Sequence, residues 1–240
     1  PIFSRSFPEI IAYGRERTQR LPQTCNGAES LIEDIPFDYS VPIDGLPRFF
    51  RTKLEDFPKR DAFLVPDPQD ADRWGKRLTE LGEGLKIGIS WLGGAPKIHE
   101  KCSIPLDLWK NLLSVDAFFV NLQYGDTVDE VAKFSADNGI TIYDWDDNNA
   151  LFDLDNQAAL ISKLDLIISV DNATVHSCIA LGKEVWDLID PSLNLLWMEN
   201  GTGVSPLSKK VQFFKKKNRN SWDTVLSCAE AQLRERVNAE

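Results

Sequence analysis

The stretch from Leu166 to His176, LIISVDNATVH, joins an uninterrupted apolar run to a polar turn and a helix start. The run Leu166–Val170 carries no charge, which is typical of a strand covered on both faces, as in parallel sheets. Asp171 and Asn172 follow at once and lead into a predicted helix, Thr174–Leu181, which Gly182 ends. A strand that passes directly into a helix is the repeating unit of an α/β fold.

The same alternation extends in both directions from this stretch. Further predicted strands lie at 85–91, 117–122, 140–143, 184–189 and 211–214, and further predicted helices at 106–113, 127–138, 156–164 and 221–237. Strands that alternate with helices at this spacing indicate βαβ units and a parallel sheet of about six strands. We therefore predict an α/β fold, with a Rossmann-like doubly wound parallel sheet over residues 85–240.

The first part of the chain lacks this regularity. Residues 1–66 show weak periodicity and many prolines, so we predict an incomplete N-terminal α/β portion there, with apolar surface left exposed or covered by another chain. A linker helix within 67–84, capped by Asp70, should connect this portion to the sheet domain at 85–240. The chain starts at Pro1 rather than Met, which favours a piece of a longer protein.

The bulk composition argues against several classes of function. The chain has 240 residues, of which 42% are hydrophobic, and its formal net charge is −10. Proteins that follow a nucleic-acid backbone usually carry a basic surface, so nucleic acid is not an expected partner. The four cysteines form no CxxC pair, and no apolar run reaches the length of a membrane span. We expect a cytoplasmic protein without a zinc site.

Two kinds of charged stretch can be interpreted in more than one way. Lys209-Lys210 and Lys215–Lys217 are interpreted as solvated loop or edge-strand charges, with a surface for an acidic partner or a membrane as the alternative. Five aspartates between residues 144 and 155 lack the ligand order of a calcium loop, so a solvated loop is favoured over a metal site. No metal and no cofactor are therefore expected.

Ligands of open α/β sheets bind at the carboxyl ends of the strands, near the point where the strand order reverses. The residues that follow the predicted strands form the candidate site: Ser90, Gly93, Gly94, Gln123, Tyr124, Asp171, Asn172, Ala173, Thr174 and His176. Free N–H groups at the helix start favour a phosphate, to which Thr174 and His176 can add donors. The alternative is structural: the polar residues cap the helix and the glycines make a tight turn. Neither the dinucleotide-binding nor the P-loop glycine fingerprint is present.

Several phrases resemble a known family. They are 85–93, 103–106, 121–125, 159–164, 165–176 and 180–186. In this order they are similar to the C-terminal domain of the heptosyltransferase-like glycosyltransferases (ADP-heptose:LPS heptosyltransferases, GT9). They are closer still to the glycosyltransferase domains that follow TPR repeats in many bacterial proteins. The resemblance covers residues 85–240, while 1–66 resembles the end of the family's N-terminal domain.

The resemblance implies a GT-B glycosyltransferase that needs no metal and moves a sugar from a nucleotide-sugar donor to an acceptor hydroxyl. The family's donor-binding Asp matches Asp171, its turn matches Asn172–Thr174, its helix His matches His176, and its first loop matches Ser90–Gly94. Lys101 is nearest to the family's basic residue, although Cys102 intervenes, and Asn172 replaces the usual Thr or Ser. These matches add Lys101 to the donor-binding candidates.

The same resemblance places most of the acceptor half, with the catalytic base, outside this chain. The acceptor stays open between a saccharide, a lipid-linked glycan and a protein, and the full-length protein would add a TPR region or the missing N-terminal portion. Three alternatives remain: a non-catalytic nucleotide-sugar-binding module, another GT-B relative such as an epimerase, and an interaction domain.

Overall fold

The computed structural model describes residues 1–11, 38–39, 41–58, 60–93, 99–148, 153–191, 208–216 and 221–239. Two compact units are present: Pro1–Ser6 with Arg60–Glu240, and Phe7–Lys59. This division differs from the predicted one, which kept residues 1–66 together. The reason is that Ile2 is buried in a core of the first unit and that Arg5 Nε donates to Val65 O at 2.9 Å.

The first unit contains a six-stranded sheet with the order β3-β2-β1-β4-β5-β6, in which every described strand pair is parallel. The strands are β1 (Lys86–Ser90), β2 (Phe118–Asn121), β3 (Ile142–Tyr143), β4 (Leu166–Val170), β5 (Val185–Ile189) and β6 (Val211–Lys215). This is the order of a Rossmann-like doubly wound sheet, so the predicted fold class is confirmed. The order reverses between β1 and β4.

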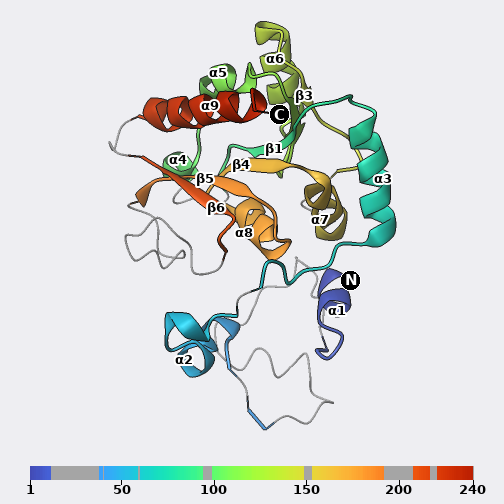
Figure 1. Cartoon of the computed structure of the whole chain (residues 1–240), viewed down its shortest axis with the longest axis vertical. Coiled ribbons are helices and arrows are strands. Elements are labelled where there is room, and N and C mark those ends of the chain that lie inside the picture. Colours follow the sequence, from blue (N-terminus) through green and yellow to red (C-terminus); the bar gives the residue numbers. More distant parts are fainter. Residues whose placement is uncertain are drawn as a thin grey trace. The chain divides into compact units, whose positions relative to one another are not determined.

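Helices cover both faces of the sheet (Figure 1). One face carries α5 (Lys110–Leu113), α6 (Val128–Asn138) and α9 (Asp223–Val237), whose apolar residues share a core with Ile89 and Trp186. The other face carries α3 (Pro68–Thr79), α7 (Leu154–Lys163) and α8 (Ala173–Ala180), which enclose a second core around Ile167. The remaining elements are α1 (Ile2–Ser6), α4 (His99–Cys102) and the 3-10 helix η4 (Leu106–Trp109).

The helix that was expected to be a linker is a layer of the first unit. Helix α3 packs along α7 and buries Trp74 completely. Its cap is Asp67 rather than the predicted Asp70: Asp67 Oδ1 accepts from the backbone N–H groups of Gln69 (2.9 Å) and Asp70 (3.2 Å). Pro68 explains the difference, because proline is favoured at the first helical position, so the cap is the residue directly before it, Asp67.

The second unit contains only short helical pieces among its described residues. They are the 3-10 helices η2 (Ile43–Gly45) and η3 (Leu54–Asp56) and the single-turn helix α2 (Pro47–Phe50). The predicted α/β character is not seen in these described residues, where no strand is found. Among the described residues of this unit, Ile43, Phe49 and Phe50 are largely exposed.

Two glycines with positive φ give a stability test of the backbone. Gly182 (φ 69°) ends α8, and a Cβ there would collide with Asp61 O, whereas Gly139 (φ 65°) ends α6 in open space. We expect Gly139→Ala to lower the free energy of unfolding by about 1–2 kcal/mol, the cost of a left-handed alanine. Gly182→Ala should cost about 2–4 kcal/mol, because the collision adds to that cost. Urea unfolding of both variants measures the difference, and equal losses would contradict the close approach of Asp61.

Candidate functional site

Gln123 joins the loop after β2 to the loop after β1. Its side-chain Oε1 accepts three hydrogen bonds, from Ser90 Oγ (3.0 Å) and from the backbone N–H groups of Trp91 (2.9 Å) and Leu92 (2.8 Å). Its Nε2 donates to Tyr124 O at 3.1 Å. Gln123 and Ser90 are both buried. Their polar atoms therefore shape the loops from inside the protein.

Asn172 extends this network across the point where the strand order reverses. Its Nδ2 donates to Ser90 Oγ (2.8 Å) and to Leu92 O (3.1 Å). Its Oδ1 accepts from Thr174 N at 2.9 Å, which caps α8. The structure thus brings together the predicted residues Ser90, Gln123 and Asn172, and the capping interpretation of Asn172 holds.

The other predicted residues of this turn lie at the start of α8. Ala173 and His176 are exposed, Asp171 is half-buried, and Thr174 is buried. Although His176 is exposed as a residue, nearby protein atoms cover part of its imidazole; this partial desolvation lowers the pKa of His176, while the Asp171 carboxylate acts in the opposite direction. The helix start offers a ligand the dipole of α8 and the His176 side chain.

Gly93 has a structural reason to be glycine. Its N–H donates to Ser103 Oγ at 3.0 Å, and an added Cβ would lie 2.5 Å from Cys102 Cβ. The glycine thus lets the end of α4 pack tightly against the β1 loop. Gly94, the second predicted glycine, lies outside the described residues. Lys101 is exposed on α4.

Three acidic side chains, Asp171, Asp187 and Asp190, lie at or near the carboxyl ends of β4 and β5. Burial raises the pKa of the Cys102 thiol, and the carboxylates of Asp171 and Asp190 raise it further. The thiol is therefore protonated at neutral pH. Lys216 Nζ lies 3.7 Å from Asp190 Oδ2.

Asp187 is the least expected of these acids. It lies within β5, opposite Ser169 of β4, and is fully buried. Neither carboxylate oxygen has a hydrogen-bond partner in the described part of the chain. Burial raises the pKa of Asp187 well above its usual range, and Asp171 adds to the rise. The sequence-based prediction missed this residue, although an aspartate inside an apolar strand is a signal that could have identified it.

A polar pocket opens beyond β2 and β3. Its volume is about 180 Å³, and its lining includes the predicted Gln123 and Tyr124. The lining residues that were not predicted are Asn121, Gly125, Thr127, Val128, Asp144, Trp145, Asp146 and Asn148. Trp145 contributes an aromatic wall, and exposed Asp144 and Asp146 contribute carboxylates. The network of Gln123, Ser90 and Asn172 connects this pocket to the start of α8.

The acidic loop at this pocket is only partly the solvated loop that was predicted. Asp147 pairs with Arg73 and Arg77, and Asp153 caps α7 by accepting from Asn156 N at 3.0 Å. Across the described ranges, no three His, Cys, Asp or Glu side chains are grouped in a way that could hold a metal ion.

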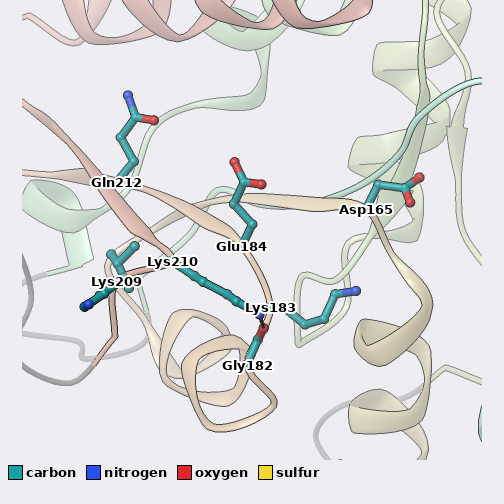
Figure 2. Close-up of a pocket in the computed structure, with 8 residues that line it drawn as sticks. Asp165, Gly182, Lys183, Glu184, Lys209, Lys210 and Gln212 are labelled. Carbon is teal, nitrogen blue, oxygen red and sulfur yellow. Dashed lines mark hydrogen bonds between the residues drawn. The ribbon is translucent and has the colours of Figure 1, made fainter. Parts of the chain in front are cut away.

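A wider hollow of about 450 Å³ lies at the opposite edge of the sheet, before the amino ends of β4, β5 and β6. Figure 2 shows that its lysines do not converge: Lys210 reaches toward Gly182, while Lys183 and Lys209 point in other directions. Lys210 Nζ donates to Gly182 O at 2.8 Å. Because ligands of such sheets bind at the carboxyl edge, we assign the candidate site to the polar pocket and the start of α8.

The chain has a relative of known sequence but matches no family model. Protein FlbA from Caulobacter vibrioides is 30% identical over 239 residues, which cover 98% of this chain. The chain spans only 39% of the length of that relative. In the described residues, no helix is both long and apolar enough to cross a membrane.

Solved structures share the fold. The heptosyltransferase II structure from E. coli, described as an ADP-heptose LPS heptosyltransferase, matches 80% of this chain and 57% of its own chain, with a TM-score of 0.52 and 16% identity. A glycosyl transferase family 9 structure from Veillonella parvula matches 75% of this chain and 54% of its own, with a TM-score of 0.54 and 11% identity. The chain therefore has the heptosyltransferase-like GT-B fold that its sequence resembles.

Asn172 gives a test of the network. Asn172→Ser keeps a capping oxygen but loses the two bonds that Nδ2 donates, so we expect a loss of about 1–2 kcal/mol in the free energy of unfolding. Asn172→Ala also loses the cap and should cost about 1 kcal/mol more. Urea unfolding of the two variants separates the contributions. A serine variant as stable as the wild type would show that the bonds to Ser90 and Leu92 contribute nothing.

Asp187 gives a test that depends on pH. The folded chain holds this proton above pH 3.8, where the unfolded chain releases it, so stability falls as pH rises toward the folded pKa. Asp187→Asn has no proton to lose, so its free energy of unfolding should gain on the wild type between pH 5 and 8, by up to about 1.4 kcal/mol per pH unit. Chemical unfolding at four pH values measures this, with Asp116→Asn at an exposed position as the control. A difference that does not change with pH would contradict a protonated Asp187.

Proposed function

We propose that this chain is the donor-binding half of a glycosyltransferase, which moves a sugar from a nucleotide-sugar to an acceptor hydroxyl. The observation that supports it most directly is that the polar pocket and the start of α8 both lie at the carboxyl edge, where together they make up the proposed donor surface. Hydrogen bonds through Gln123, Ser90 and Asn172 hold its parts together. The shared fold adds support, since the two structural neighbours are named as an ADP-heptose heptosyltransferase and a family 9 glycosyl transferase.

Each part of this surface suits one part of such a donor. The pocket has an aromatic wall at Trp145 and carboxylates at Asp144 and Asp146, which suit the flat base and the hydroxyls of a nucleoside. The start of α8 suits the diphosphate, because the helix dipole favours an anion there even on a chain with net charge −10. Ala173 is small and exposed, so a phosphate can approach the backbone closely.

The chemistry that follows is stabilisation of a leaving nucleoside diphosphate. Negative charge develops on the diphosphate as the bond to the sugar breaks, and preorganised donors at the helix start favour that state. In this proposal the His176 imidazole contacts the diphosphate, and Lys101 adds a cation from α4. Asp171 lies on the sugar side. The acceptor site and the catalytic base belong to other parts of a longer cytoplasmic protein, and no metal takes part.

Calorimetric titration with ADP, GDP, UDP and CDP tests donor binding. We expect one of them to bind and His176→Ala to weaken its binding by about 10-fold, since a hydrogen bond to a charged group is worth about 1.5 kcal/mol or more. Ser177→Ala is the matched control, because Ser177 is the next residue on α8 and bonds to Ala173 O at 3.0 Å within the helix. Urea midpoints of both variants check that the fold is intact.

Failure of every nucleoside diphosphate to bind would overturn the proposal in favour of an interaction domain. Equal affinities of His176→Ala and wild type would remove His176 from the site and support a packing role. Binding without glycosyl transfer by the full-length protein would identify a non-catalytic module.

A further inference from the structure

Helix α3 packs behind the wall of the polar pocket that Trp145 forms, although this helix precedes the sheet in the chain. The ring centroids of Trp74 on α3 and Trp145 in the pocket wall are 5.3 Å apart. The Arg77 guanidinium lies over both rings, 4.7 Å from the centroid of Trp74 and 5.6 Å from that of Trp145. A guanidinium at these distances is attracted to the faces of the indoles. Arg77 thus connects α3 to the wall of the pocket.

Two arginines of α3 also hold the loop that carries Trp145. Asp147 accepts from Arg73 Nη1 at 2.7 Å and from Arg77 Nη1 at 2.6 Å, one arginine on each carboxylate oxygen. The hydrogen bond from Arg77 lowers the pKa of Asp147, and the charges of Arg77 and Arg73 lower it further, so the pair stays ionised. A carboxylate held at both oxygens restricts the orientation of the loop.

Buried Asn156 of α7 completes this attachment. Its Oδ1 accepts from Arg73 Nη2 (2.6 Å) and from Trp74 Nε1 (2.8 Å), and its Nδ2 donates to the backbone O of Asp147. The backbone and the side chain of Asp147 are therefore fastened by two different helices, two residues beyond Trp145. The Trp145 ring itself stacks on Tyr143, with centroids 6.2 Å apart and an interplanar angle of 27°.

We propose that Arg77 is a positioning residue for ligand binding: together with Asp147 it holds the Trp145 indole as the wall against which a flat aromatic ring, the base of a nucleoside, stacks in the polar pocket. This inference rests on the proposed function for the nature of the ligand. Helix α3 then contributes to ligand binding by positioning Trp145, although its own residues do not touch the ligand.

The exposure of the Arg77–Asp147 pair gives the inference a sharp test. The two side chains are 32% and 45% exposed, and ion pairs so open to solvent contribute little to the stability of a fold. If Arg77 contributed only to the stability of the fold, its removal would weaken the binding of every ligand slightly and to the same extent. If it positions Trp145, its removal should weaken binding of the base much more than it lowers stability.

The experiment compares Arg77→Ala and Arg77→Lys with Lys76→Ala, a control at an exposed position of the same helix. The first measurement needs no ligand: acrylamide quenching of the Trp145 emission, taken as the difference between each protein and its Trp145→Phe version. The second is the calorimetric affinity for the tightest-binding of ADP, GDP, UDP and CDP and for inorganic pyrophosphate. Pyrophosphate has no base, so its affinity reports on the phosphate site alone.

We expect Arg77→Ala to make Trp145 more accessible to acrylamide and to weaken binding of the nucleoside diphosphate about 5- to 20-fold, the lower part of the range for a lost base–aromatic stack. Pyrophosphate affinity and the urea midpoint should stay close to wild type. Arg77→Lys keeps the charge without the planar fork, so its nucleotide affinity should fall between those of the wild type and Arg77→Ala. Trp145→Ala should weaken nucleotide binding to a similar extent. Adding Arg77→Ala to this variant should lower the nucleotide affinity little further.

Acrylamide quenching of Trp145 that is unchanged in Arg77→Ala would overturn the positioning role. An equal loss of affinity for the nucleotide and for pyrophosphate would overturn it as well. If the wild type binds no nucleoside diphosphate, the proposed function and the ligand assignment fail together. The quenching measurement then still decides whether Arg77 orients Trp145.

Discussion

The arrangement of the site depends on one buried hydrogen-bond network at the reversal of the strand order. Strands β1 and β4 are neighbours in the sheet, but the chain leaves them toward helices on opposite faces, so their loops diverge. Asn172 crosses this gap to Ser90, and Gln123 joins it from β2. Because these polar atoms are buried, each needs its partner, and the cost of losing one keeps the three loops in register. The pocket and the helix start are therefore rigid relative to each other.

The strands could be predicted because burial on both faces leaves a direct mark in the sequence. Every residue of β4 is buried, and its run of apolar and small residues shows it. Caps were less certain, since several polar residues precede each helix and local geometry selects one of them. At α3, Pro68 at the first helical position selected Asp67 over Asp70. The edge strand β3 was overestimated, since it keeps only Ile142–Tyr143 of the predicted 140–143, whereas the other edge strand, β6, extends one residue beyond the predicted 211–214.

The site was predictable only where it follows the strands directly. Ser90, Gln123 and Asn172 were correctly placed at the carboxyl edge, but a sequence does not tell whether a polar side chain faces a ligand or another loop, and these three face each other. Trp145 was not identified, because its role depends on Arg77, which lies far away along the chain. Asp187 was treated as one more strand residue, although its solitary burial separates it from its apolar neighbours. Contacts between distant segments and unsatisfied burial become visible only in three dimensions.

The division of the chain has an evolutionary consequence. Ser6 and Val65 are neighbours in the first unit, since Val65 N donates to Ser6 Oγ at 2.9 Å, while residues 7–59 form a unit of their own. The whole second unit is therefore an excursion whose two ends return to nearly the same place. In general, closing a loop costs only about 0.6 kcal/mol more for each doubling of its length. Insertions and deletions can accumulate there over generations without shifting the sheet, so this is the segment in which homologues are free to diverge in length.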